Sequence, residues 1–324
     1  MVDRTRRVLV AGLAGVAMGL GTGLAPALAQ GKKLRIVTTT GMIADAVRQV
    51  GGEHVEVTAL LGPGVDPHMY RQTSSDIAAA MRADAVFWHG LNLEAQMKAF
   101  FDGLGRSKPV VALGETLPKE VLLSDQGNSG LPDPHVWMNP RLWKGIVTAA
   151  RDALARIRPE AKADFEAGAA TYLSELDRLA DYADRAFASV PAASRVLVTA
   201  HDAFNYFGKA YGYEVMGIQG VSTESEAGLK RIEDLVRVLV ERRIGAIFVE
   251  SSVSDRNVRA LIEGAAAKGH KVVIGGELFS DAMGEPGTYE GTYLGMIDHN
   301  ATVVTRALGG EAPPKGLHGR LARS

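Results

Sequence analysis

The 324-residue sequence predicts an α/β protein of two related lobes with mostly parallel sheets, joined by one long rigid helix. Short apolar runs rich in β-branched residues alternate with helical patterns, which is typical of α/β units. This alternation occurs twice, on either side of a long helical pattern. We therefore expect a signal peptide at 1–29, an N-terminal lobe at 30–158, a linking helix at 159–190, a C-terminal lobe at 191–312 and a polar tail at 313–324.

The two lobes are expected to share one plan. The segment RIVTTTGMIADAVRQVGG from Arg35 aligns with RVLVTAHDAFNYFGKAYG from Arg195, and ADAVFW and IGAIFV follow in the same order. The sequence identity between the two lobes is weak, and any two β-α-β units share part of this apolar pattern. The order and spacing of the segments nevertheless favour related lobes. The expected strands are Leu34–Thr39, Val55–Leu61, Ala85–Trp88, Pro109–Leu113, Arg195–Ala200, Glu214–Ile218, Ala246–Glu250 and Lys271–Ile274.

The linking helix is predicted from apolar residues at three- and four-residue steps, between Pro159 and Pro191. These apolar positions are Phe165, Tyr172, Leu176, Leu179, Ala183 and Ala186. At roughly 1.5 Å per residue such a helix is about 40 Å long. A continuous helix of this length restrains the opening of the two lobes.

The beginning of the chain has the pattern of a secretory signal. Three arginines within the first seven residues precede the apolar run Val8–Leu24, and Ala27-Leu28-Ala29 then supplies a signal-peptidase pattern. The run is shorter than the roughly 20 residues that span a bilayer. We expect cleavage near Ala29 and a periplasmic protein. The pair Arg6-Arg7 also fits a twin-arginine signal, so the export route stays open.

Composition narrows the class of protein further. The absence of cysteine excludes disulfides, thiolate metal ligands and a lipid-modified cysteine, so we expect a soluble periplasmic protein. Lys and Arg number 36 against 37 Asp and Glu, and no basic stripe indicates nucleic acid. No pattern indicates oligomerisation, and a monomer is expected.

Three histidines lie beyond the carboxyl ends of predicted strands, where open parallel sheets bind ligands. They are His68, His135 and His201, and Asp281 follows the last predicted strand. Two ligands from each lobe would place an ion in the cleft between the lobes. Three imidazole nitrogens and one carboxylate suit Zn(II) and accommodate Mn(II) or Fe(II). Affinity is expected to fall as unperturbed imidazole titrates, near pH 6.5.

The tripeptide Asp-Pro-His occurs twice, ending at His68 and at His135. Proline fixes its own φ angle and restrains the residue before it, so each tripeptide forms a stiff bracket for its histidine. Asp66 and Asp133 are candidate acceptors that orient the imidazoles. His89 ends a predicted strand without an assigned role. The other histidines are expected to be surface groups: His54, His270, His299 and His318.

Glu250, at the end of a predicted strand, has two interpretations. Its carboxylate either accepts a hydrogen bond from a ligand imidazole or caps a helix expected to begin near Ser254. The sequence does not decide between them.

Five segments carry a resemblance to the zinc and manganese receptor family of ABC transporters, the cluster A-I solute-binding proteins. They are GPGVDPHMY, DPHVWMNP, VTAHDAFNYFGKAYG, IFVESSVSDRNV and LFSDAMGEPGTYEGTYLGMIDHN, within about Leu34 to Leu308. The resemblance implies metal ligands at His68, His135, His201 and Asp281, two lobes joined by a rigid helix, and delivery of the ion to an ABC transporter membrane permease.

The resemblance also bears on the metal. Manganese receptors of the family often carry glutamate at the third ligand position, where this chain has His201, as zinc and mixed receptors do. The segment before His135 lacks the histidine-rich loop of many dedicated zinc receptors. This difference counts against a dedicated zinc receptor, but the softness of the imidazole ligands favours zinc, with manganese as the rival.

A secreted zinc hydrolase is the alternative from a different class, because three protein ligands plus water form a catalytic zinc site. The sequence has no His-Glu-x-x-His, no Gly-x-Ser-x-Gly elbow and no phosphate-binding glycine loop. We therefore expect a binding protein that is not an enzyme.

Overall fold

The structure, a computed structural model, describes residues 32–125, 127 and 130–322. The predicted signal peptide and its cleavage position lie outside these residues. From Lys33 onward the chain forms one unit. Within the described ranges, every helix is too short or too polar to cross a bilayer.

The first half of the chain forms a four-stranded parallel sheet with the strand order β2-β1-β3-β4. In register, Leu34 lies opposite Val55 and Ile36 opposite Ala85. The strands are β1 Leu34–Thr38, β2 Val55–Ala59, β3 Ala85–Trp88 and β4 Val110–Ala112. β3 is buried along its whole length, as its unbroken apolar sequence predicts.

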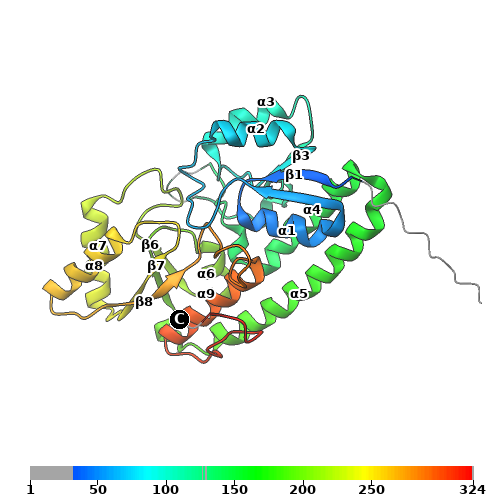
Figure 1. Ribbon diagram of the computed structural model, residues 1–324. Helices are drawn as coiled ribbons and strands as arrows, with labels where there is room; N and C mark the ends of the chain where they lie inside the picture. Colours follow the sequence, from blue (N-terminus) through cyan, green and yellow to red (C-terminus); the bar gives the residue numbers. More distant parts are fainter. Residues whose placement is uncertain (1–31, 126, 128–129, 323–324) are drawn as a thin grey trace, which may run out of the picture. The chain divides into compact units, whose positions relative to one another are not determined.

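Helices cover both faces of this sheet (Figure 1). They are α1 Gly41–Gly51 and α4 Pro140–Ile157 on one face, and α2 Ser74–Arg82 and α3 Lys98–Leu104 on the other. Their starts follow from the sequence. Thr73 and Asp76 form a capping box at α2, and Asn139 caps α4 directly before Pro140, which suits a first helical position.

The second half repeats the strand order of the first, but its strands form two two-stranded parallel ladders, β5-β6 and β7-β8. β5 of the first ladder lies next to β7 of the second, so the strands follow the order β6-β5-β7-β8. The strands are β5 Val196–Thr199, β6 Glu214–Gly217, β7 Ala246–Glu250 and β8 Val273–Leu278. The helices are α6 Asn205–Tyr211, α7 Leu229–Glu241, α8 Arg256–Ala267 and α9 Tyr293–Ala307.

The last strand lies further along the chain than the sequence predicts. β8 begins at Val273 and continues through Gly275 and Gly276 to Leu278, whereas the expected strand was Lys271–Ile274. The ladder with β7 is irregular between Ile247 and Phe248, and Gly276 has a φ of 152°. Glycine tolerates this irregular backbone, so the strand continues beyond it.

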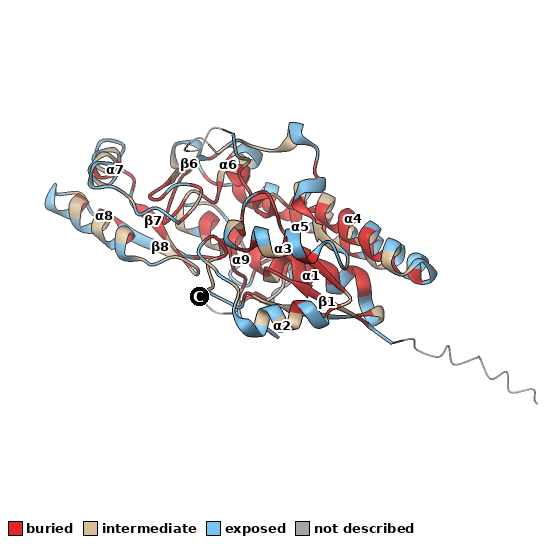
Figure 2. Cartoon of the chain, turned by 90° about the horizontal axis from the view of Figure 1, so that it is seen from above, coloured by how far each residue is buried: buried red, intermediate tan, exposed pale blue. Residues whose placement is uncertain are grey.

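The long helix α5, Lys162–Ala188, has 27 residues and packs against α1, α4 and α9. It starts after a tight 3₁₀ turn at Pro159–Ala161, because proline suits a first turn. One apolar core runs continuously along α4, α5 and α9 and takes in side chains from both halves, such as Phe87 and Phe248. Figure 2 shows that α4 and α5 each carry both buried and exposed residues.

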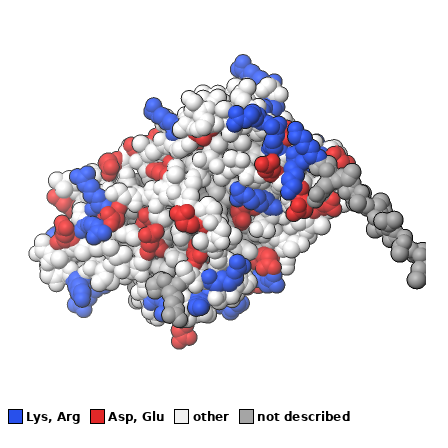
Figure 3. Space-filling view, viewed as in Figure 1, with Lys and Arg blue, Asp and Glu red and all other residues white. Residues whose placement is uncertain are grey.

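The predicted polar tail packs onto the protein. The backbone N–H of Leu317 donates to the carboxylate of Asp298 in α9, at 2.9 Å to each oxygen. The side chain of Leu321 is buried, and the Arg320 guanidinium lies over the Tyr289 ring. On the face seen in Figure 3, charges of both signs are interspersed.

Candidate metal centre

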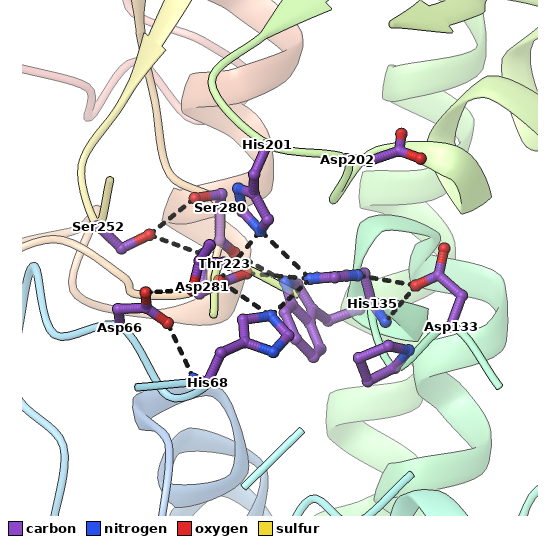
Figure 4. Close-up of polar contacts among 12 residues, drawn as sticks. Asp66, His68, Asp133, His135, His201, Asp202, Thr223, Ser252, Ser280 and Asp281 are labelled. Atoms are coloured by element: carbon purple, nitrogen blue, oxygen red, sulfur yellow. Dashed lines mark hydrogen bonds and ion pairs between the residues drawn. The ribbon is translucent and has the colours of Figure 1, made fainter. Parts of the chain in front are cut away.

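The structure brings together the four side chains predicted as ligands (Figure 4). His68 lies in the loop between β2 and α2, and His135 directly precedes the 3₁₀ turn Val136–Met138. His201 follows β5 by two residues, and Asp281 follows β8 by three. All four side chains are buried. They converge because parallel strands of both halves end toward the same region.

The spacing of the donor atoms suits a small tetrahedral cation. Nε2 of His135 lies 3.4 Å from Nε2 of His68 and 3.4 Å from Nε2 of His201. The Asp281 carboxylate oxygens lie 3.2 Å from Nε2 of His201, 3.4 Å from that of His135 and 3.6 Å from that of His68. Donors about 2.1 Å from a tetrahedral ion are about 3.4 Å apart. Five of the six donor pairs therefore have the spacing of a tetrahedral site, and all four donors lie within 4.8 Å of one another.

Asp281 provides a second indication of a cation. Both of its carboxylate oxygens are buried and make no well-aligned hydrogen bond in the described part of the chain, so the imidazoles of the cluster are the groups that balance their charge. Leaving a buried charge unsatisfied costs several kcal/mol, so such groups normally bind a partner or a metal. Burial raises the pKa of Asp281, but His201 and His135 hold it well below its usual range. The carboxylate is thus ionised and directed at the imidazoles.

The two Asp-Pro-His brackets share a backbone turn. In each, the aspartate Oδ1 accepts a hydrogen bond from the backbone N–H of the histidine two residues later, at 2.8 Å for Asp66 and 2.9 Å for Asp133. The intervening proline has no N–H, so it does not compete for the oxygen. Asp133 also contacts Nδ1 of His135 at 2.7 Å. Asp66 makes no such contact with the ring of His68.

Glu250 orients His201 in the same manner as Asp133 orients His135. It accepts the backbone N–H of His201 at 2.8 Å and lies 2.5 Å from Nδ1 of the ring. These contacts turn Nε2 toward the site. Asp255, not Glu250, is the residue at the start of α8.

The three imidazoles have different pKa values. Burial lowers the pKa of His135, but Asp133 and Asp281 outweigh burial and raise it to about 9. Burial lowers that of His201 too, while Glu250 and Asp281 raise it well above its usual value. His68 lacks a carboxylate on Nδ1, and burial lowers its pKa to about 3. A bound metal must therefore displace protons from His135 and His201 at neutral pH.

Further residues anchor the turn that carries His135. His89 contacts the carbonyl oxygen of Pro134 through Nε2 at 2.7 Å. The Trp137 indole donates to the carbonyl of Ser280 at 2.8 Å, and Tyr206 donates to the carbonyl of Asp133 at 2.8 Å. No local pattern in the sequence predicted the contacts of His89 and Tyr206. Trp137 lies two residues after His135, and this closeness in the chain is the one feature of the sequence that indicates a role near the site.

The remaining histidines lie away from this cluster. His54 pairs with Asp164 at 2.8 Å. Nε2 of His270 contacts the carbonyl of Ile244, and that of His299 the carbonyl of Glu277. His318 lies beside the Tyr289 ring. Each of these four histidines therefore has a partner of its own outside the cluster.

Fold and site together define the chain as a member of a family of metal-uptake receptors. Residues 36–307 match the family described as "Zinc-uptake complex component A periplasmic", and the chain belongs to this family. The resemblance inferred from the sequence is thereby confirmed.

Particular relatives carry different metals in their names. The chain is 45% identical over 277 residues to the manganese-binding lipoprotein MntA of Bacillus subtilis, covering 86% of this chain and 90% of MntA. It is 45% identical over 299 residues to the zinc-binding protein TroA of Treponema pallidum, covering 90% of this chain and 96% of TroA.

Solved structures share the fold. The periplasmic zinc-binding protein TroA of Treponema pallidum superimposes with a TM-score of 0.83 at 46% identity, covering 85% of this chain and 99% of TroA. The Fe(III)-bound YtgA of Chlamydia trachomatis gives a TM-score of 0.77 at 26% identity, covering 86% of this chain and 99% of YtgA.

Proposed function

We propose that this protein is a periplasmic receptor that captures one divalent metal ion and delivers it to the membrane permease of an ABC importer. The observation that carries the proposal is the convergence of four buried donors at coordination spacing: Nε2 of His68, His135 and His201 and the carboxylate of Asp281. Family membership supports the transport role.

Zinc is the first candidate ion and manganese the alternative. Three imidazoles and one carboxylate, with five of their six donor pairs 3.2–3.6 Å apart, suit tetrahedral Zn(II), while manganese favours more oxygen donors. The relatives do not decide the question, because MntA and TroA are equally identical to this chain and are named for different metals. Manganese is therefore the second candidate for the captured ion.

Binding fits the site better than catalysis does. A catalytic zinc keeps a position open for water, whereas four protein donors fill a tetrahedral shell. We infer that the two α/β lobes, 30–158 and 191–312, enclose the ion as a monomer and that the linking helix 159–190 limits their opening. The signal peptide at 1–29, cleaved near Ala29, would export the chain.

Native mass spectrometry of the chelator-stripped mature protein tests the proposal. We expect one ion per chain when Zn(II) and Mn(II) are offered at equal concentration, with zinc retained. Retention of manganese against zinc would overturn the choice of metal. No tightly held ion of either kind would contradict the receptor function itself.

A pair of histidine variants tests the ligand assignment. His201→Ala removes a donor whose other nitrogen is held by Glu250, so tight zinc binding should be lost. His299→Ala removes a histidine that contacts the carbonyl of Glu277, and affinity should be unchanged. Competition against a chelator of known affinity measures both. Equal affinities in the two variants would refute the assignment.

A further inference from the structure

His68 is held differently from the other two imidazoles. Asp133 and Glu250 fix the rings of His135 and His201 through their Nδ1 atoms. No hydrogen bond joins Nδ1 of His68 to any other described residue. The position of His68 therefore depends on its backbone, whose N–H donates to Asp66.

The Asp66 carboxylate is held by the other half of the protein. Its Oδ2 accepts a hydrogen bond of 2.5 Å from the hydroxyl of Thr223, 157 residues further along the chain. Apart from its own turn, Asp66 has no other hydrogen-bond partner in the described ranges. Figure 4 shows Thr223, Asp66 and His68 side by side at the edge of the site. The turn of His135, in contrast, has anchors at His89, Tyr206 and Asn205.

Thr223 belongs to the loop 218–228 between β6 and α7. The three residues after Thr223, 224–226, are exposed. Within this loop Thr223 is itself buried, at 9% exposure. Glu224 makes a second contact with the first half, accepting a hydrogen bond from Gln96 at 2.6 Å. A movement of this exposed loop away from the first half would therefore pull directly on Asp66.

The loop before His68 also comes close to the second half. Gly64 has a φ of 69°, and a Cβ at this position would lie 3.3 Å from the carbonyl oxygen of Ser251. Glycine thus permits a left-handed turn in a narrow space. The close approach keeps Asp66 within reach of Thr223.

From these contacts we infer that Thr223 is a positioning residue that holds His68 against the ion through Asp66, and that loosening the loop 218–228 frees His68 before the other ligands. The inference rests on the proposed function, because it concerns release of the captured ion. It makes His68 the exit ligand, controlled from a loop of the opposite half that is exposed at residues 224–226. His135 and His201, each held by a carboxylate, stay in place.

The test compares zinc dissociation from Thr223→Val and Thr223→Ser. Valine keeps the shape of threonine but removes the hydroxyl, whereas serine retains it. Thr171→Val is the matched control, because Thr171 is exposed on α5 and its hydroxyl donates only to the carbonyl of Ala167. Zinc-loaded proteins are mixed with excess chromogenic chelator in a stopped-flow instrument, and association is measured separately.

We expect zinc to leave Thr223→Val about tenfold faster than wild type, the effect of losing one hydrogen bond to a charged group. Thr223→Ser and Thr171→Val should stay within about twofold of wild type. Association rates should be unchanged, since the donors themselves are intact. Equal dissociation rates for Thr223→Val and wild type would overturn the inference, as would failure of serine to rescue.

A double-mutant cycle separates this coupling from a general loss of stability. In an Asp66→Asn background, Thr223→Val should add little further acceleration, because the hydrogen bond is already weakened. Fully additive effects would contradict the inference. A wild-type protein that binds neither zinc nor manganese would instead refute the proposed function, which is a distinct result.

Discussion

Two of the three imidazoles at the site carry a carboxylate on the nitrogen that faces away from the other donors. Asp133 contacts His135, and Glu250 contacts His201. Such partners fix the orientation of the ring and raise its basicity as a ligand. The same carboxylates raise the pKa values of both rings in the metal-free protein.

Replacement of Glu250 tests this role. Glu250→Gln retains an acceptor near His201 but removes the negative charge, so zinc affinity should fall about 10–100-fold. Competition with a chelator at pH 7.5 measures the change. Glu263→Gln, at an exposed position of α8, is the matched control and should bind as wild type does. Unchanged affinity in Glu250→Gln would show that the charge does not act on the ligand.

His89 contacts the Asp-Pro-His turn that carries His135. It is fully buried, and burial lowers its pKa to about 4, so the ring is neutral and its contact with the Pro134 carbonyl is an N–H donation. His89→Leu removes this hydrogen bond and leaves the Pro134 carbonyl with only the backbone N–H of Val136, at 2.7 Å, so it should lower the free energy of unfolding by about 1–3 kcal/mol. Urea unfolding of the stripped protein measures it. The exposed His318→Leu should change it by less than about 0.5 kcal/mol.

At the residue scale, the sequence predicts the four converging side chains better than it predicts what holds them. Their positions after strands, the repeated tripeptide and the family resemblance are all visible in the sequence. The contact of Thr223 with Asp66 joins residues far apart in the chain, and no local pattern marks it. The different environments of Asp66 and Asp133 likewise depend on tertiary contacts that identical tripeptides do not reveal.

Among the elements, α5 is the one that ties both halves to a common core. Its Tyr172 hydroxyl donates to Asp45 of α1 at 2.8 Å, and the backbone N–H of Tyr293 in α9 donates to the same carboxylate at 3.1 Å. The Tyr293 hydroxyl continues to the carbonyl of Trp137, beside the metal centre. A chain of buried hydrogen bonds thus connects the long helix with the turn that carries His135.

Removal of the Tyr172 hydroxyl tests this connection. Asp45 is buried, and burial raises its pKa, so its carboxylate depends on the remaining donors. Tyr172→Phe should lower the free energy of unfolding by about 1–3 kcal/mol while one zinc per chain still binds. Urea unfolding and mass spectrometry measure the two quantities. Equal stability of variant and wild type would contradict the role of this bond.

Most elements follow from the sequence because apolar runs and helix caps are local signals. The shift of β8 is the informative exception. The strand was expected at Lys271–Ile274, but pairing with β7 continues past Gly275 and Gly276 to Leu278. Tertiary pairing outweighed the local signal there, as it commonly does in strands. The result matters for the site, since the end of β8 sets the position of Asp281.

On the scale of the whole molecule, the metal-free site should make stability depend on pH. The folded-state pKa of His135, about 9, lies above its unfolded value near 6.5. Its contribution to stability is therefore complete below pH 6.5 and is lost as the pH rises through about 9. The reason is that deprotonation removes the positive charge that neutralises Asp133 and Asp281.

The melting temperature of the stripped protein should accordingly fall between pH 6.5 and 9.5. The zinc-loaded protein should not show this fall, because the bound ion supplies the positive charge in place of the protons. Fewer protons compete for the imidazoles as the pH rises, so zinc binding then stabilises the protein more. Calorimetric scans of both forms measure the difference, which should widen with pH. A stripped protein whose melting temperature stays constant across this range would contradict the protonated state of the empty site.

The central claim is that His68, His135, His201 and Asp281 hold one metal ion within a single coordination shell. A crystal structure of the zinc-loaded protein, with diffraction recorded on both sides of the zinc absorption edge, tests it most directly. We predict one strong anomalous peak, about 2.0–2.2 Å from the three Nε2 atoms and an Asp281 oxygen. A principal peak elsewhere, or coordination that omits two or more of these residues, would contradict the account.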